Sequence, residues 1–263
     1  MKFALATLVL AGSALAAPKL TSRERFARRL ERRSAGRSSQ PKIASEGLAA
    51  LATNNSHVEY SSNWAGAVLS KTTATWTAVT GTFTVPTPKA PSGSTTAYAS
   101  AWVGIDGDTC GNAILQTGVD FNVESGRVSY DAWYEWYPDY AYDFSGISFS
   151  AGDSVTTTVK ATSKTGGTAT VKNNSKGTSV THTFSGQPSL CEYDAEWIVE
   201  DFESNGGLVP FANFGTVTFT GASATSSSGS VGPSGATIID IEQSNKVLTS
   251  CSASSSSVTC SYV

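Results

Sequence analysis

From Tyr60 to the end of the chain, short runs of β-branched and aromatic residues alternate with turns rich in Gly, Ser, Pro and Asn. Such runs are typical of β-strands, because these side chains pack well on a pleated sheet. An amphipathic helical period of useful length is missing from this region. We predict an all-β sandwich or barrel, with strands at 73–85, 97–105, 128–137, 154–162, 168–172, 178–184, 195–202, 216–220, 237–242 and 258–263.

Three of the expected strands place acidic and aromatic side chains on one face, because successive residues of a strand point to opposite sides. The face holds Tyr98, Trp102 and Asp106 in the first strand, Asp131, Trp133, Glu135 and Tyr137 in the second, and Glu196, Ile198 and Glu200 in the third. One interpretation is the wall of a cleft that binds an extended polymer. The other is a solvent-facing surface with ordinary cross-strand pairs, and the alternation alone does not choose between them.

The N-terminus has a different pattern. A Lys at position 2, an apolar run over 3–10 and Ala14-Leu15-Ala16 predict a secretory signal peptide, residues 1–16. That run is too short to span a bilayer, so we expect no membrane partner. Residues 17–57 are rich in Arg, above all at 23–33, and we interpret them as a basic propeptide. A disordered, solvated tail is the alternative.

Charge is divided unevenly along the chain. Residues 18–58 carry nine Lys and Arg against three Glu, a net charge of +6, whereas residues 59–263 carry eight Lys and Arg against eighteen Asp and Glu, a net charge of −10. The acidic body would repel phosphate, so no nucleic-acid partner is expected. The basic arm is instead expected to bind the acidic body of its own chain.

Four cysteines form an even set, as expected of disulfides in a secreted chain. Cys251 and Cys260 flank a Ser-rich tip between strand-like segments, which indicates a terminal hairpin closed by a disulfide. Cys110 and Cys191 would then pair and connect the segment before Gln116 to the segment before Glu200. In the chain-entropy model, closing so long a loop contributes about 4–5 kcal/mol to stability.

Common catalytic constellations are missing from the sequence. His57 falls in the expected propeptide, and His182 lies in a polar strand without a nucleophile elbow nearby. Zinc-ligand spacings, a phosphate loop and the paired turns of an aspartic peptidase are absent as well. We therefore expect no metal and no cofactor, and the candidate chemistry rests on carboxylates and amides.

Several blocks of the chain closely resemble the fungal glutamic peptidases, the eqolisins. They are YSSNWAG at 60–66, WVGIDGDTC at 102–110, AILQTG at 113–118, YDAWYEWYP at 130–138, AEWIVEDF at 195–202 and LVPF at 208–211. The resemblance covers residues 58–263, which we take as the peptidase domain. One known branch of the family has an extra cysteine pair in the loop after the fifth block, and loop 204–207 has none.

The resemblance implies a sandwich of two curved antiparallel sheets, of the concanavalin A-like or jelly-roll type, with the substrate cleft on the concave face. It also implies an acid endopeptidase with a Gln/Glu dyad, here Gln116 and Glu200. Substrate-binding or supporting roles are expected for Trp102, Asp106, Asp120, Asp131, Trp133, Glu135 and Tyr137. The implied partners are protein or peptide substrates and the chain's own propeptide, and we expect a monomer.

The chemistry suits this dyad. In acid a histidine would be cationic and unable to accept a proton, whereas a carboxylate whose pKa lies near the working pH still can. Glu200 is predicted to take a proton from water, while the Gln116 amide, which does not titrate, holds the water and stabilises the oxyanion.

Other functions use the same residues. A glycosidase could use Glu135 and Glu200 but gives Gln116 no necessary role, and a lectin needs only the aromatic wall. A secreted structural sandwich is the third alternative. Separately, the sequon at Asn173 makes it a candidate for N-glycosylation.

Overall fold

The computed structural model describes residues 36–45 and 58–263, and both ranges belong to one compact unit, Ala35–Val263. The described residues form two large sheets and a small one, and no helix is found among them, so none that could cross a membrane. The predicted signal peptide and the Arg-rich stretch 23–33 lie outside these ranges.

One large sheet has nine strands. Its order is β18 (Lys246–Val247), β17 (Thr237–Gln243), β3 (Trp64–Ser70), β12 (Asp194–Glu200), β5 (Thr96–Ile105), β6 (Ile114–Glu124), β7 (Arg127–Tyr137) and β8 (Tyr142–Asp143). The ninth strand, β2 (Val58–Ser61), pairs in parallel with β17, while the other pairs are antiparallel. The expected purely antiparallel sheets therefore need this one correction.

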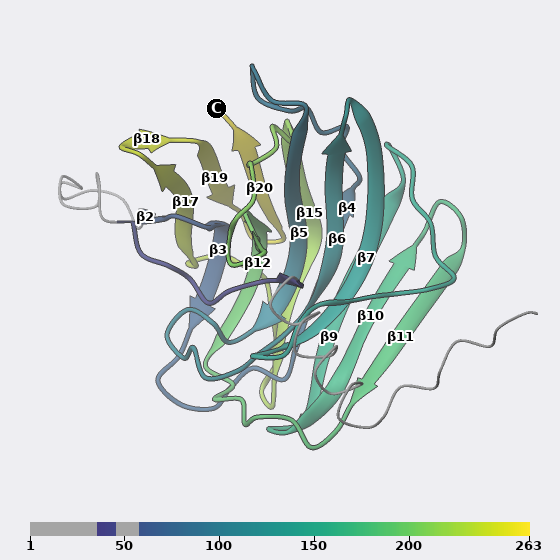
Figure 1. Cartoon of the computed structure of the whole chain (residues 1–263). Coiled ribbons are helices and arrows are strands. Elements are labelled where there is room, and N and C mark those ends of the chain that lie inside the picture. The colour runs from purple at the N-terminus through teal and green to yellow at the C-terminus, as the bar shows by residue number, and fades with distance from the viewer. Residues whose placement is uncertain (1–35, 46–57) are drawn as a thin grey trace, which may run out of the picture. The chain divides into compact units, whose positions relative to one another are not determined.

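The other large sheet has eight strands. Its order is β11 (Thr178–Phe184), β10 (Gly166–Asn173), β9 (Ser154–Ser163), β4 (Ala78–Thr84), β15 (Thr216–Ser226), β20 (Ser257–Tyr262) and β19 (Thr249–Ala253), and β16 (Gly229–Val231) pairs with β15. A small sheet combines β1 (Arg37–Ser38), β13 (Glu203–Ser204) and β14 (Gly207–Leu208). Figure 1 shows β4 and β15 behind β5 and β12 of the nine-stranded sheet, which they contact.

The hydrophobic core lies between the two large sheets. Phe83 and Phe219 from the eight-stranded sheet meet Val119 and Phe121 from the other, and all four are buried. Trp197 belongs to the same core, and its indole N–H donates to the Thr80 carbonyl across the sandwich at 2.8 Å. The predicted all-β sandwich is confirmed, as is the core-facing side of β12.

The opposite face of the nine-stranded sheet, here called the outer face, carries the polar side chains. Residues directly opposite each other in neighbouring strands point to the same side. Register therefore sets Gln116 beside Glu135 and Gly104, and Glu200 beside Ser100 and Trp64. The predicted acidic and aromatic faces of β7 and β12 are correct, and both contribute to the outer face.

Most strand predictions match observed strands, but one begins later than expected and several observed strands were not predicted. The strand expected over 73–85 begins only at Ala78, because the N–H groups of Thr75 and Trp76 donate to the Glu192 carbonyl in a loop instead of joining the sheet. Strand β6, which carries Gln116, was not predicted, and neither was β3.

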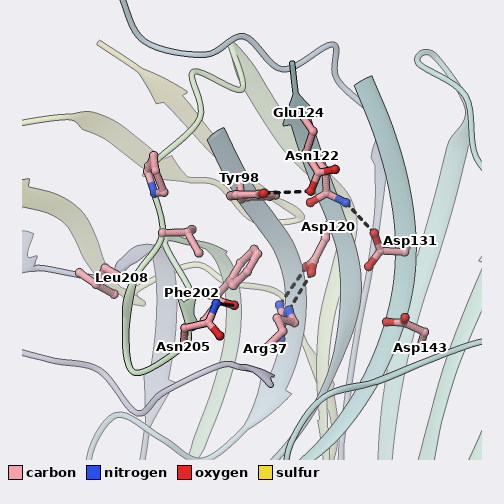
Figure 2. Close-up of a pocket in the computed structure, with 13 residues that line it drawn as sticks. Arg37, Tyr98, Asp120, Asn122, Glu124, Asp131, Asp143, Phe202, Asn205 and Leu208 are labelled. Carbon is pink, nitrogen blue, oxygen red and sulfur yellow. Dashed lines mark hydrogen bonds and ion pairs between the residues drawn. The ribbon is translucent and has the colours of Figure 1, made fainter. Parts of the chain in front are cut away.

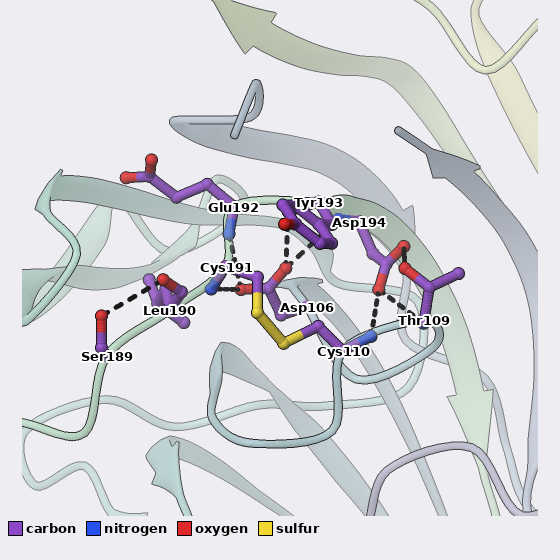
Figure 3. Close-up of a disulfide and its surroundings, with 9 residues drawn as sticks. All are labelled: Asp106, Thr109, Cys110, Ser189, Leu190, Cys191, Glu192, Tyr193 and Asp194. Carbon is purple, nitrogen blue, oxygen red and sulfur yellow. Dashed lines mark hydrogen bonds between the residues drawn. A yellow bond between two sulfur atoms is a disulfide. The ribbon is translucent and has the colours of Figure 1, made fainter. Parts of the chain in front are cut away.

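Both expected disulfides are present. Cys251 and Cys260 face each other in the β19–β20 hairpin, and Cys110 is bonded to Cys191. The second bond joins the loop that precedes β6 to the loop that precedes β12 (Figure 3). The two strands that carry Gln116 and Glu200 are therefore connected covalently just before each begins.

Candidate active site

Glu200, the last residue of β12, is completely buried on the outer face. One of its carboxylate oxygens accepts the indole N–H of Trp102 at 2.8 Å. The other accepts the backbone N–H of Gln40 at 3.0 Å. Burial raises the Glu200 pKa to about 7, against the opposing effects of Arg37 and of these hydrogen bonds.

Gln116 lies on the same face in β6, and it is also completely buried. Neither its amide nitrogen nor its amide oxygen has a hydrogen-bond partner among the residues that the structure describes. A buried amide without partners is costly, which indicates that the group has another use. Its donor and its acceptor are both available to a substrate or a water molecule.

Two glycines leave room for Trp102 between these residues. A Cβ atom on Gly118 would lie 2.4 Å from the Ala101 carbonyl oxygen and 2.5 Å from Trp102 Cβ. A Cβ atom on Gly104 would lie 2.6 Å from a Glu196 oxygen and 2.8 Å from the Trp102 ring. Neither position has space for a side chain. The Trp102 indole therefore packs directly against the backbone of these glycines, and its N–H donates to Glu200.

Residues 36–45, here called the strap, cross the outer face and occupy the site. The strap begins in the small sheet, where Arg37 and Ser38 pair with Ser204 and Glu203. Further along, the carbonyl of Gln40 accepts the indole N–H of Trp64 at 2.9 Å. In Figure 1 the strap is the dark purple segment that passes in front of the sheet.

Arg37 binds the acidic part of the site. Its guanidinium donates to both oxygens of Asp120, at 2.7 and 2.9 Å (Figure 2). It also lies 3.4 Å from Glu135. The same group lies over the rings of Trp133 and Phe202, 3.8 and 4.4 Å from their centroids. Charge-assisted pairs and ring faces together hold an arginine strongly.

Glu135 is the third carboxyl group beneath the strap. It is completely buried and accepts the Ser39 N–H at 3.1 Å and the Ser38 hydroxyl at 3.2 Å. Burial raises its pKa to about 8, a change that Arg37 and the Ser39 N–H oppose. The strap thus supplies hydrogen-bond donors to both Glu135 and Glu200.

A groove of about 530 Å³ continues beyond Arg37 along β6 and β7. Its lining residues are acidic, aromatic and apolar, and they include Tyr98, Asp120, Asp131, Asp143 and Phe202. Figure 2 shows Asp131 facing Asn122, whose amide donates to it at 2.6 Å. Burial, and then the charges of Asp120 and Asp143, raise the Asp131 pKa to about 7.

The remaining predicted site residues support the cleft in different ways. Trp133 donates its indole N–H to Ser100 at 3.1 Å beneath Arg37, and Tyr137 packs half-buried against the aromatic cluster of the outer face. Asp106 does not line the groove. Its carboxylate accepts the backbone N–H groups of residues 191–194 at 2.7 to 3.2 Å, and so fixes the loop before β12 (Figure 3).

Three features of the site were missed at the sequence level. Arg37 lies outside the Arg-rich stretch 23–33, on which the prediction of a basic arm depended most. Ser39 and Gln40 reach Glu135 and Glu200 through backbone N–H groups, which the residue type does not reveal. Phe202, which packs over Arg37, is the last residue of the block that contains Glu200, and its position there could have drawn attention to it.

The glycosylation candidate Asn173 does not fit its surroundings. The residue is completely buried, and its amide nitrogen donates to the Ser148 carbonyl at 2.9 Å and to Asp153 at 2.8 Å. A glycan attached to that nitrogen would replace one of its two N–H donors, so at least one of these bonds would be lost, and the buried site has no space for a sugar. The structure therefore argues against glycosylation of Asn173 in the folded chain.

The arrangement can perform acid–base chemistry on a bound polymer. It brings together a buried carboxyl group able to exchange a proton, an unpartnered amide, and a groove that already holds an extended peptide. Within residues 36–45 and 58–263, no group of three or more His, Cys, Asp or Glu side chains could hold a metal ion.

Known proteins are similar to this chain over nearly its whole length. The chain is 55% identical to Aspergillopepsin-2 of Aspergillus niger, with all of both chains covered. It is 43% identical to Scytalidopepsin B of Scytalidium lignicola, over 98% of this chain and 97% of the relative. Both relatives are peptidases by name.

Solved structures and a family model agree with these relatives. Scytalido-glutamic peptidase with a transition state analog inhibitor aligns at a TM-score of 0.70 and 47% identity, over 77% of this chain and 98% of that one. Aspergilloglutamic peptidase from Aspergillus niger aligns at a TM-score of 0.62 and 66% identity, over 64% of this chain and 99% of that one. The Peptidase A4 family model matches residues 62–262. The resemblance noted in the sequence is confirmed: the chain is a glutamic peptidase and belongs to the Peptidase A4 family.

Proposed function

We propose that this chain is a secreted acid endopeptidase, insensitive to pepstatin, that is made as a proenzyme and cuts peptide bonds with Glu200 and Gln116. One observation carries the proposal: the buried Glu200 carboxylate accepts a peptide N–H of the strap, while Gln116, on the same face of the sheet and paired with Glu135, keeps an unpartnered amide. Two solved structures of scytalido-glutamic peptidase contain transition state analogs, which suits a site that stabilises a reacting peptide.

Glu200 is the general base and then the general acid. Ionised, it removes a proton from a water molecule, whose oxygen attacks the peptide carbonyl carbon. Protonated, it returns that proton to the nitrogen as the C–N bond breaks. The hydrogen bond from the Gln40 N–H to Glu200, 3.0 Å long, shows how close a peptide nitrogen can come to this carboxyl group.

Gln116 holds the water and the developing negative charge. Its amide oxygen can accept a hydrogen bond from the water, and its NH₂ group can donate to the oxyanion. Because the amide does not titrate, the donor persists at every acid pH. Loss of a single such donor typically lowers turnover about 10²- to 10³-fold.

The strap is the part of the propeptide that blocks the cleft. It occupies both oxygens of Asp120 through Arg37 and one oxygen of Glu200 through Gln40, but it gives Gln116 no hydrogen bond. A peptide that uses the base without the oxyanion donor is bound as an inhibitor and not as a substrate.

Acid releases the strap and prepares the base. Carboxylates lose their charge as the pH falls, and Arg37 then loses the partners that hold it. Departure of the strap returns water to Glu200. Because burial is the largest cause of the raised Glu200 pKa, that pKa falls toward the acid range, and the carboxylate can again accept a proton.

Digestion of a denatured protein near pH 3 tests the proposal. Processed wild type should cut it equally well with and without pepstatin, since an aspartic dyad is not used. The Gln116→Ala variant should cut it about 10²- to 10³-fold more slowly. Cleavage that pepstatin abolishes, or that the substitution leaves unchanged, would contradict the mechanism.

A further inference from the structure

We propose that the cleft contains a subsite for a cationic side chain, formed by Asp108 and Glu59, which selects substrates with Lys or Arg three residues after the bond that is cut. The proposal rests on the proposed function, because it takes the position of the cut from the role of Glu200. It assigns a specificity role to two carboxyl groups outside the dyad.

The strap gives the register. In the proposed mechanism Glu200 returns its proton to the leaving nitrogen, and Gln40 is the strap residue whose nitrogen lies 3.0 Å from that carboxylate. Gln40 therefore marks the first residue after the cut, and Lys42 marks the third. The chain is held in between by the Trp64 indole on the Gln40 carbonyl and by the Lys42 N–H on the Gly107 carbonyl, at 2.9 and 3.0 Å.

Lys42 inserts its ammonium group between two carboxylates. It forms ion pairs with Asp108 and with Glu59, the latter at 2.6 Å. The Asp108 side chain is only 7% exposed and that of Glu59 is 53% exposed. One partner is thus buried in the wall of the cleft, while the other leaves an open path for a cation to enter.

The surroundings of Asp108 strengthen its attraction for a cation. Asp194 contributes negative charge from β12, and Glu59 adds its own from β2. Lys42 is the cation facing this group among the described residues that influence the Asp108 pKa. A neutral or acidic side chain in its place would leave these carboxyl groups without a counter-charge.

The subsite is fixed by the fold and persists without the strap. Loop 106–110 is held by the Cys110–Cys191 disulfide and by Asp194, which accepts the Thr109 N–H at 2.7 Å and the Thr109 hydroxyl at 2.8 Å. Glu59 is held by the pairing of β2 with β17. A site whose groups are already in position loses little entropy when a substrate enters.

The preference for Lys or Arg three residues after the cut is expected to increase as the pH rises within the active range. Burial raises the Asp108 pKa, and Lys42 lowers it, while Asp194 and Glu59 raise it further. Without a cation, Asp108 is then neutral at low pH and regains its charge as the pH increases. The preference for a basic residue should follow that charge.

Two synthetic peptides that differ at one residue provide the test. Both carry a single cleavable bond, verified by mass spectrometry, with Lys or Gln three residues beyond it. Near the upper end of the active pH range, processed wild type should give a kcat/KM about fivefold higher for the Lys peptide, as for a good partly exposed ion pair. In Asp108→Asn the ratio should fall below about twofold, whereas Glu192→Gln, which removes the same charge from the loop before β12, should keep it.

The outcomes separate this inference from the proposed function. Equal cutting of both peptides by wild type, or an unchanged ratio in Asp108→Asn, overturns the subsite alone. Failure to cut either peptide overturns the proposed function and the subsite with it. If Asp108→Asn does not fold, a peptide of residues 36–45 should inhibit the wild type about fivefold better than its Lys42→Gln counterpart, and equal inhibition overturns the subsite.

Discussion

The buried carboxyl group of Asp106 and those of Glu200 and Glu135 accept hydrogen bonds from different parts of the chain. Asp106 accepts four backbone N–H groups from residues 191–194, all of them permanent parts of the fold. Glu200 and Glu135 accept their backbone N–H groups from Gln40 and Ser39, which belong to the strap. The residue types are alike, and the difference lies in whether the donors can leave.

This difference separates a structural carboxylate from a reactive one. When the strap departs, Asp106 keeps its donors, while Glu200 keeps only the Trp102 indole and gains access to water and substrate. Burial raises the Asp106 pKa, and the N–H groups of residues 192–194 oppose that rise by favouring the charged form. Both oxygens of Asp106 stay occupied by these donors in the folded chain. We therefore expect substitution of Glu200 to lower activity and substitution of Asp106 to lower stability.

The largest effect is expected for Glu200→Gln. The variant keeps the shape of the side chain but cannot accept a proton, so processed enzyme should lose about 10⁴-fold in kcat. Initial rates on a denatured protein near pH 3 measure this. Glu192→Gln, a change of the same charge in the loop before β12, is the matched control, and equal losses in both variants would contradict the assignment.

Arg37→Gln should raise the activity of the unprocessed chain, which the strap keeps latent, more than it changes the activity of the processed enzyme. The unprocessed chain loses the bidentate pair with Asp120 and the contacts with two rings. Removal of such a charge should loosen the strap by at least about 2 kcal/mol, roughly 30-fold. Measured near pH 6, cleavage by the unprocessed variant should rise accordingly, whereas Arg127→Gln, at an exposed arginine of β7, should stay latent. Equal latency in both would argue against the role of the strap.

Asp106→Asn addresses the structural side of the comparison. The amide offers one acceptor oxygen where the carboxylate offers two, so some of the buried N–H groups of residues 191–194 lose their partner. We expect the melting temperature to fall by at least about 5 °C at pH 5. Glu135→Gln should shift it less, because burial raises the Glu135 pKa to about 8 and this carboxyl group is already neutral at pH 5. Equal shifts would remove the distinction between the two groups.

The smallest effect is a gradual loss of stability toward neutral pH. Burial raises the pKa values of Asp201 and Asp240 to about 8 and 6, and that of Asp131 to about 7, above the ordinary values of carboxyl groups. In the folded state these groups bind protons more tightly than in the unfolded state. Stability is then greatest below about pH 4 and declines as the pH rises to about 8. Thermal unfolding at pH 4 and 7.5 should show a lower melting temperature at pH 7.5, and the reverse order would be inconsistent with these shifts.

How far sequence predicts this structure differs between two strands that are equally buried. In β12, the charged Glu196 and Glu200 alternate with apolar residues, so the pattern revealed both faces although all seven residues are buried. The first eight residues of β6 are buried as well, and on its outer face the polar Gln116 and Asp120 are separated by Gly118. This weaker alternation did not reveal the strand, and only the resemblance to a family implied a role for Gln116.

The strap marks a second limit. Residues 36–45 have little intrinsic preference for a strand, and their position depends on Asp120 and Glu200, 83 and 160 residues away from their partners in the strap. Ion pairs and backbone bonds over such separations leave no periodic signal. Charge asymmetry predicted that the basic arm binds the acidic body of its own chain, but it did not indicate that Arg37 contacts Asp120.

The absent side chain of Gly118 has a consequence for judging other sequences. A single methyl group at that position would collide with the Ala101 carbonyl and with Trp102, and would move the indole that donates to Glu200. A related chain can thus retain both members of the dyad and still be inactive. When genomes are searched for working enzymes of this kind, a residue larger than glycine at this position should classify a sequence as a pseudoenzyme, even though glycine takes no part in the reaction.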